Sequence, residues 1–68
     1  MNEDILKGQW KQLMGKARQK WGKLTDDDLI MIEGDREVLL GKIQELYGRS
    51  RADAMKEVDK WLEAAGSR

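Results

Sequence analysis

The stretch WGKLTDDD, residues 21–28, marks the end of one helix and the start of the next. Thr25 is a preferred N-cap residue, and Asp28 stands three positions later, where its carboxylate can bond back to the cap. The two intervening aspartates place negative charge in the first turn, where the helix dipole favours it. Gly22 can take the left-handed conformation that ends many helices. The stretch therefore predicts two helices that meet at a turn, with Thr25 as the N-cap of the second.

The same signals recur along the chain and divide it into four helices. Asp35 directly follows Gly34, and Ser50 follows Gly48 by two positions, so both polar residues are predicted N-caps. Glycines at 22, 34, 48 and 66 are predicted helix stops. We predict helices over 9–21, 26–33, 36–47 and 51–65. Whether residues 1–7 are frayed or add a turn stays open.

Apolar residues recur at helical spacing in these segments, and no segment alternates as a strand does. One such arc contains Trp10, Leu13, Ala17 and Trp21. The arcs predict an all-α fold in which one face of each helix is buried. The predicted core consists of Trp10, Leu13, Ala17, Trp21, Leu29, Ile32, Leu39, Ile43, Leu46, Tyr47, Met55, Val58 and Leu62.

A repeat underlies the pattern. Glycines 8, 15 and 22 recur as glycines 34, 41 and 48, an offset of 26 residues, and the aligned halves share six identical residues. An internal duplication would make each half a helical hairpin, with the two hairpins closing over one core. The repeated glycines lie opposite the apolar arcs of their own helices. Their face either contacts another backbone or a partner closely, or faces solvent and tolerates glycine.

The composition favours one small, non-catalytic domain. The chain has 68 residues, room for a single core, and we treat residues 1–68 as one domain. It contains no His and no Cys, which removes imidazole catalysis, thiol chemistry, disulfides and the usual zinc ligands. It shows neither a signal-peptide pattern nor a membrane-spanning apolar run, so we expect a cytoplasmic monomer with no membrane partner. We expect no enzymatic activity and no cofactor.

Candidate reactive groups are few. Residues 26–28 together with Glu33 are the only acidic cluster that could attract a hard divalent cation, but their spacing is not that of a calcium-binding loop. Helix capping accounts for the same residues fully. Ser50 has no histidine partner to activate it as a nucleophile. The sequence therefore predicts no catalytic residue and no metal site.

The net charge is zero, but the charges are strongly segregated. Between residues 5 and 24 the chain has no acid and six bases, namely Lys7, Lys11, Lys16, Arg18, Lys20 and Lys23. Interleaved with two tryptophans, these bases suggest a surface for phosphate backbones or single-stranded bases. The tryptophans, however, lie on the apolar arc, where burial is the commoner outcome, and the bases flank that arc on both sides. We therefore favour core packing and keep nucleic-acid binding as the alternative.

Three motifs resemble the CsbD-like family of small bacterial proteins, and most closely its YjbJ branch: WGKLTDDD at 21–28, IEG at 32–34 and GKIQE at 41–45. The resemblance extends over nearly the whole chain. It implies a compact bundle of four short helices, arranged as two roughly orthogonal hairpins like a SAM domain. It also implies a cytoplasmic protein of the general stress response that has no catalytic residues.

These observations predict a non-enzymatic stress-response protein. It would act by contact with another macromolecule or as an abundant soluble protectant, whose support is the hydrophilic mean hydropathy of -0.77. The identity of the partner stays open. Another protein is one candidate, and a nucleic acid is a less favoured one.

Overall fold

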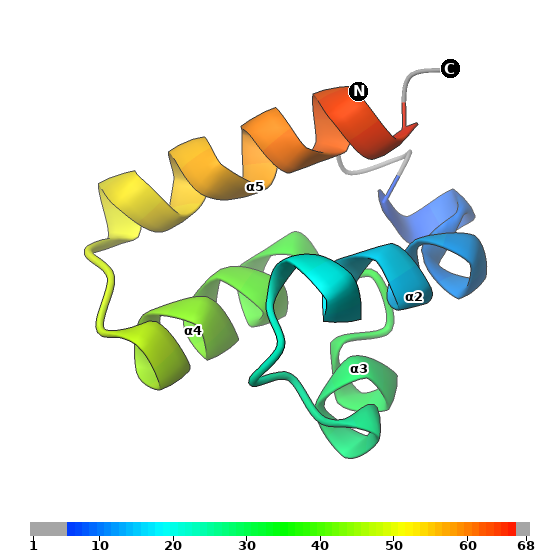
Figure 1. The fold of residues 1–68 in the computed structure, drawn as a ribbon, viewed down its shortest axis with the longest axis horizontal. Coiled ribbons are helices and arrows are strands. Elements are labelled where there is room, and N and C mark those ends of the chain that lie inside the picture. Colours follow the sequence, from blue (N-terminus) through cyan, green and yellow to red (C-terminus); the bar gives the residue numbers. More distant parts are fainter. Residues whose placement is uncertain (1–5, 67–68) are drawn as a thin grey trace.

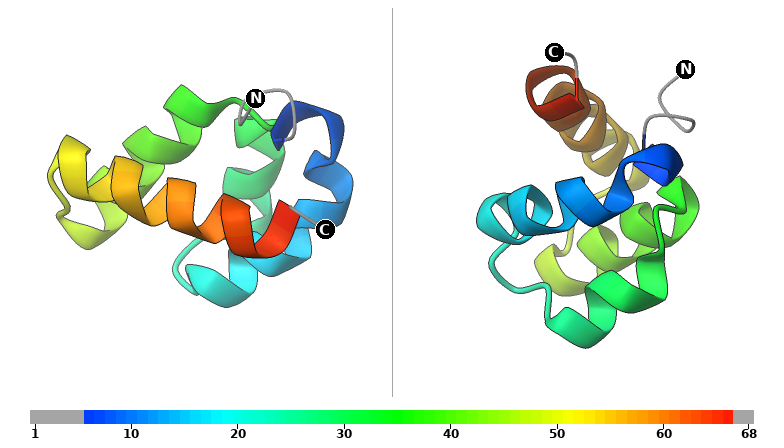
Figure 2. Two further views of the ribbon diagram at one scale, coloured as in Figure 1. Left: turned by 90° about the horizontal axis from the view of Figure 1, so that it is seen from above. Right: turned by 90° about the vertical axis from the view of Figure 1, so that its right-hand side faces the viewer.

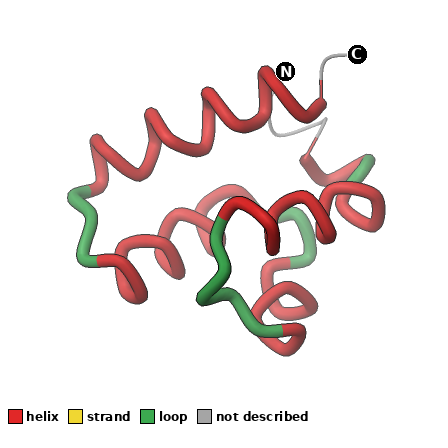
Figure 3. Tube along the Cα trace, in the orientation of Figure 1, coloured by secondary structure: helices red, strands yellow, loops and turns green. Residues whose placement is uncertain are grey.

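The computed structural model of the chain describes residues 6–66, and this part is all-helical, without strands. The helices follow one another along the chain, joined by short loops (Figures 1 and 3). Residues 6–8 form one further helical turn before α2, so the described part has five helical segments: the four predicted ones and a turn whose presence was left open. Residues 1–5 of the segment left open lie outside the described part. The other four are α2 (Trp10–Lys20), α3 (Asp26–Ile32), α4 (Arg36–Tyr47) and α5 (Arg51–Gly66).

Polar side chains begin three of these helices. The Thr25 hydroxyl accepts a hydrogen bond from the Asp28 backbone N–H, and the Asp28 carboxylate accepts one from the Thr25 N–H, both at 3.1 Å. This reciprocal pair satisfies two N–H groups that a helix start leaves unpaired. Asp35 Oδ1 accepts from the N–H of Glu37 at 2.9 Å. Ser50 Oγ accepts from the N–H of Asp53 at 3.1 Å.

The helix ends depart from the glycine pattern. Gly34 and Gly48 have the left-handed conformation, with φ of 80° and 68°. Gly22 does not, because α2 ends at Lys20, and the N–H of the next residue, Trp21, already bonds to the Ala17 carbonyl. The left-handed residue that ends α3 is Glu33, with φ of 52°. The predicted helix stop at Gly22 is confirmed, but it does not use a left-handed glycine.

The helices pack in three levels. α4 and α5 run in opposite directions and are joined by residues 48–50 (Figure 1). α2 lies between the level of α5 and that of α3, which is at the opposite side of the molecule from α5 (Figure 2). α5 packs against α4 and α2, while α3 packs against α4. Within residues 6–66, α3 keeps one side exposed, at positions 26, 27, 30 and 31.

The core lies where these levels meet. Ten of the predicted core residues are buried, and Leu46, Tyr47 and Met55 are partly buried at its edge. Trp21 and Trp61 meet edge to face, with ring centroids 5.0 Å apart, and so join the end of α2 to α5. Tyr47 stays at the edge because its hydroxyl accepts a hydrogen bond from the Lys23 N–H at 3.0 Å. Buried apolar side chains absent from the predicted core are Leu6, Leu24, Leu40, Ala54 and Trp61.

The two halves of the chain correspond in their helix boundaries. α2 begins at Trp10 and α4 begins at Arg36, which are 26 residues apart. This is the offset of the sequence repeat, and α3 and α5 begin one residue away from it. The corresponding core positions differ in size, as with Ala17 and Ile43. The described helices include none long and apolar enough to cross a membrane.

Candidate functional site

The six bases of the first segment are all exposed, but most of them bind other parts of the chain. From α2, Lys16 Nζ donates to the Ala65 carbonyl at 3.4 Å. Lys20 lies 4.0 Å from a Glu57 carboxylate oxygen. Arg18 pairs with Asp26 at the start of α3. These contacts link α2 to both of its neighbours, because the acids that follow residue 25 fold back alongside the basic helix.

A second set of contacts surrounds Tyr47. Lys23 Nζ donates to the Leu46 carbonyl at 3.3 Å and lies 5.1 Å from the centre of the Tyr47 ring. The Arg49 guanidinium lies 5.4 Å from the same ring centre. Arg49 also pairs with Glu57 at 3.2 Å. Of the six bases, Lys7 and Lys11 alone have no carboxylate or carbonyl partner within the described residues, so no continuous free basic surface results.

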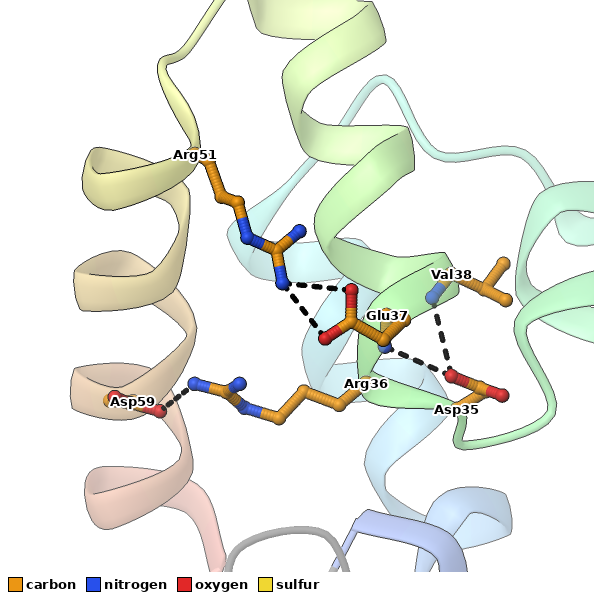
Figure 4. Close-up of polar contacts among 6 residues, drawn as sticks. All are labelled: Asp35, Arg36, Glu37, Val38, Arg51 and Asp59. Atoms are coloured by element: carbon orange, nitrogen blue, oxygen red, sulfur yellow. Dashed lines mark hydrogen bonds and ion pairs between the residues drawn. The ribbon is translucent and has the colours of Figure 1, made fainter.

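Ion pairs also connect α4 with α5 (Figure 4). Arg36 bonds to Asp59 at 2.7 Å, and its side chain is only 14% exposed. Arg51, at the first position of α5, donates from one nitrogen to both carboxylate oxygens of Glu37 at 2.9 Å. The two ion pairs join α4 to α5 at two positions along α5, Asp59 and Arg51. They occupy charged groups that would otherwise be available to a ligand.

The acidic residues of α3 have different surroundings. Lys42 Nζ lies 3.2 Å from Asp28, whose carboxylate also caps the helix. The hydrogen bond from the Thr25 backbone, followed by the one from Lys42, lowers the pKa of Asp28 below its ordinary value of 3.8. Asp27 is exposed. Across residues 6–66 no three acidic side chains come together as ligands for a metal ion.

The repeated glycines are not close-packed, with one exception. A Cβ atom on Gly8, Gly15 or Gly41 would meet nothing within 4 Å. A Cβ on Gly34 would lie 2.9 Å from the Lys7 Cα and 3.0 Å from the Leu6 carbonyl. Gly34 is therefore the position at which the turn after α3 presses against the helical turn at 6–8. Gly22 and Gly48 are equally open, so of the two explanations for the glycines, solvent exposure holds among residues 6–66 for the other five.

The structure exposes an apolar pair that the sequence reasoning missed. Ile30 and Met31, adjacent on α3, are each 60% exposed and are the large apolar residues most open to solvent in the described chain. A signal for them was present: residues 29–32 are four successive apolar residues in a short helix. α4 and α2 both lie on the inner side of α3, so only Leu29 and Ile32 face inward.

Comparison with known proteins decides the family. The sequence profile described as CsbD-like matches residues 4–57, which include α2, α3, α4 and the first part of α5. The chain belongs to the CsbD-like family. No solved structure matches it significantly. The family match thus covers all the bases and acids described above except Asp59, which lies two residues beyond it.

Relatives within this family are similar over most of their length. The chain is 57% identical to the UPF0337 protein YjbJ of Escherichia coli O6:H1 over 61 residues, which are 90% of this chain and 88% of that protein. It is 56% identical to YjbJ of Salmonella typhimurium, again over 61 residues, 90% of this chain and 87% of the relative. A UPF0337 protein of Pseudomonas aeruginosa is 55% identical over 58 residues, 85% of this chain and 89% of its own.

Proposed function

We propose that this CsbD-like protein is a non-enzymatic, cytoplasmic, monomeric protein of the bacterial stress response that acts by contact with another macromolecule. The observation that carries the proposal is that the polar side chains cap helices and link them to one another. Thr25, Asp28 and Asp35 cap helices, and Arg36 holds α4 to α5. Groups engaged in this way stabilise the fold rather than activate a substrate, so the surface is the part that can act.

The protein's internal order supports contact over bulk protection. A protectant that works by mass needs no defined surface, whereas this chain fixes its helices through caps and inter-helix ion pairs. It also keeps an apolar pair exposed on one helix. An exposed apolar pair lowers solubility. Exposed apolar side chains that lie together mark many interaction sites, which supports a binding role for this pair. The SAM-domain-like pairing into two hairpins belongs to the same proposal, and the opposed directions of α4 and α5 support one of these hairpins (Figure 1).

Two assays separate the proposal from the protectant hypothesis. In the first, the chain carries a photo-crosslinking residue at an exposed position and is irradiated in an extract of stressed bacteria at rising concentration. We expect discrete crosslinked species whose yield saturates and falls when unlabelled chain competes. In the second, an unrelated enzyme is heated or dried with the chain or with an equal mass of albumin. We expect no more protection from the chain than from albumin.

The opposite pattern would reject contact as the function. Protection that exceeds albumin and scales with mass, together with no competed crosslinked species, identifies a protectant. In a third assay, short duplex or single-stranded DNA is added to the chain, and binding is followed by amide NMR at low salt. Salt-sensitive shifts around Lys16, Lys20 and Lys23 would identify the nucleic-acid alternative, since phosphate contacts weaken steeply as salt rises.

A further inference from the structure

The outward side of α3 combines exposed apolar and acidic residues. At 100° per residue, Asp26, Asp27, Ile30 and Met31 fall within an arc of about 140°. All four are exposed, while Leu29 and Ile32 on the opposite side are buried. The arc thus places two carboxylates in the first turn and two large apolar side chains in the next. Among residues 6–66 no other helix covers this arc, and Arg18 of α2 reaches only its edge, at Asp26. α3 lies at the edge of the molecule farthest from α5 (Figure 2).

Acidic groups bracket the apolar pair at both ends of the helix. Asp27 precedes the pair and Glu33 follows it, and both are exposed. Neither has an ion-pair partner among residues 6–66, whereas Asp26 is neutralised by Arg18. The face therefore has apolar anchors at its centre and unneutralised negative charge on both sides. This arrangement is complementary to a segment with apolar side chains between basic ones.

We propose that the outward face of α3, with Ile30 and Met31 as anchors and Asp27 and Glu33 as flanking charges, binds a basic amphipathic helical segment of a partner protein. Methionine suits such a surface, because its flexible, polarisable side chain adapts to different apolar partners. Nucleic acids and anionic lipid surfaces do not fit here, since both would be repelled by the flanking carboxylates. The inference deepens the proposed function and rests on it.

The size of the face sets the kind of complex. α3 has seven residues and is therefore about 10 Å long at 1.5 Å per residue, enough to lie along about two turns of a partner helix. A patch of this size is at the small end of specific interfaces. We expect a weak, rapidly exchanging complex whose affinity falls as salt screens the flanking charges.

The test uses the full chain and a defined probe. The probe is a helical peptide of about 14 residues with leucines at i, i+3, i+4 and i+7 and lysines on both sides of that stripe. Its counterpart replaces every lysine with glutamate. Amide and methyl NMR of the chain is recorded during titration with each peptide. We expect the basic peptide to cause saturable shifts centred on Ile30 and Met31, and the acidic peptide to cause none.

Variants with matched controls test the anchors and the charge. Because both apolar residues are exposed, we expect the double variant Ile30→Ser with Met31→Ser to keep the fold. Its affinity for the basic peptide, measured by fluorescence anisotropy of the peptide, should be lower by about tenfold or more. The control is Ala52→Ser with Ala64→Ser, two exposed positions on α5, which should leave affinity unchanged. Asp27→Asn should weaken binding about threefold. Its control, Asp53→Asn, alters an exposed aspartate in the first turn of α5 and should not.

Several results would overturn the inference while leaving the proposed function standing. One is equal binding of the acidic and basic peptides, and another is shifts that map to α2 or α5. A third is self-association through Ile30 and Met31, seen as concentration-dependent shifts of the chain alone, because a second copy would then occupy the face. If the crosslinked species of the preceding test persist in Ile30→Ser with Met31→Ser, the contact surface lies elsewhere. If those species never form, the proposed function itself fails.

Discussion

The indole N–H of Trp10 donates a hydrogen bond to the backbone carbonyl of Leu29 at 2.9 Å, which ties the start of α2 to the last turn of α3. The same carbonyl accepts from the N–H of Glu33 at 3.3 Å, at the residue that ends α3 in the left-handed conformation. Trp21 differs, because its buried indole N–H finds no acceptor within residues 6–66. Two tryptophans of one core therefore make opposite polar contributions to stability.

This difference predicts unequal effects of replacing each tryptophan with phenylalanine. Both replacements remove a similar volume from the core, so their packing losses are comparable. Trp10→Phe also loses a buried hydrogen bond, whereas Trp21→Phe removes an unpaired buried donor. We expect Trp10→Phe to cost about 1 kcal/mol more than Trp21→Phe. Urea unfolding followed by circular dichroism measures both, and an equal or reversed order would contradict the contrast.

The reciprocal hydrogen bonds between Thr25 and Asp28 predict a loss of stability for Thr25→Ala that Thr25→Ser avoids. Thr25→Ala removes the acceptor for the Asp28 N–H and should lower the free energy of unfolding by about 1 kcal/mol. Thr25→Ser keeps the hydroxyl and should stay close to the original stability. Thermal unfolding of the three proteins makes the comparison. If Thr25→Ser lost as much as Thr25→Ala, the hydrogen bond would not be the cause.

Two glycines of the repeat predict opposite responses to alanine. At Gly34 a Cβ meets backbone atoms, and φ of 80° disfavours any side chain, so Gly34→Ala should destabilise the protein by more than about 1 kcal/mol. At Gly41, inside α4, a Cβ meets nothing within 4 Å. Gly41→Ala should therefore stabilise the protein by up to about 1 kcal/mol. Denaturant midpoints with opposite signs would support this difference, and a loss at Gly41 would contradict it.

Asp28 predicts an acid-dependent part of the stability. Its pKa is lower in the folded chain than its ordinary value of 3.8, so the ionised form favours folding. That stabilisation is present above the ordinary value and is lost as pH falls through it and then through the lower folded pKa. Asp28→Asn should therefore be less stable than the original chain at pH 7, and the difference should shrink in acid. Urea midpoints measured along a pH series give the comparison.

A matched variant isolates the local cause of this pH dependence. Asp27→Asn changes an exposed neighbour in the same helix turn, and it should keep the pH profile of the original chain. Lys42→Met removes the second-largest cause of the lowered pKa and should flatten the profile partly, because the Thr25 hydrogen bond remains. Identical profiles for the original chain and Asp28→Asn would contradict the assignment.

The positions of the main helices were predictable because their signals are local. α4 was predicted at its observed bounds, since Asp35 begins it and Gly48 ends it. The residues buried along α2 followed from helical periodicity alone. Leu24 lies between two helices, outside any period, and was missed. Ala54 and Trp61 were missed although both lie on the buried side of α5, where they stand one turn before and after Val58.

The sequence by itself determined the helical class, the caps and most of the buried positions, because these depend on residues within one or two turns of each other. Only the tertiary structure decided which bases remain free, since Lys16 and Lys20 find their partners on α5, more than thirty residues away. It also decided that Ile30 and Met31 face solvent. A helix's own pattern shows how many sides are apolar, but the neighbouring helices determine how many of those sides can be covered.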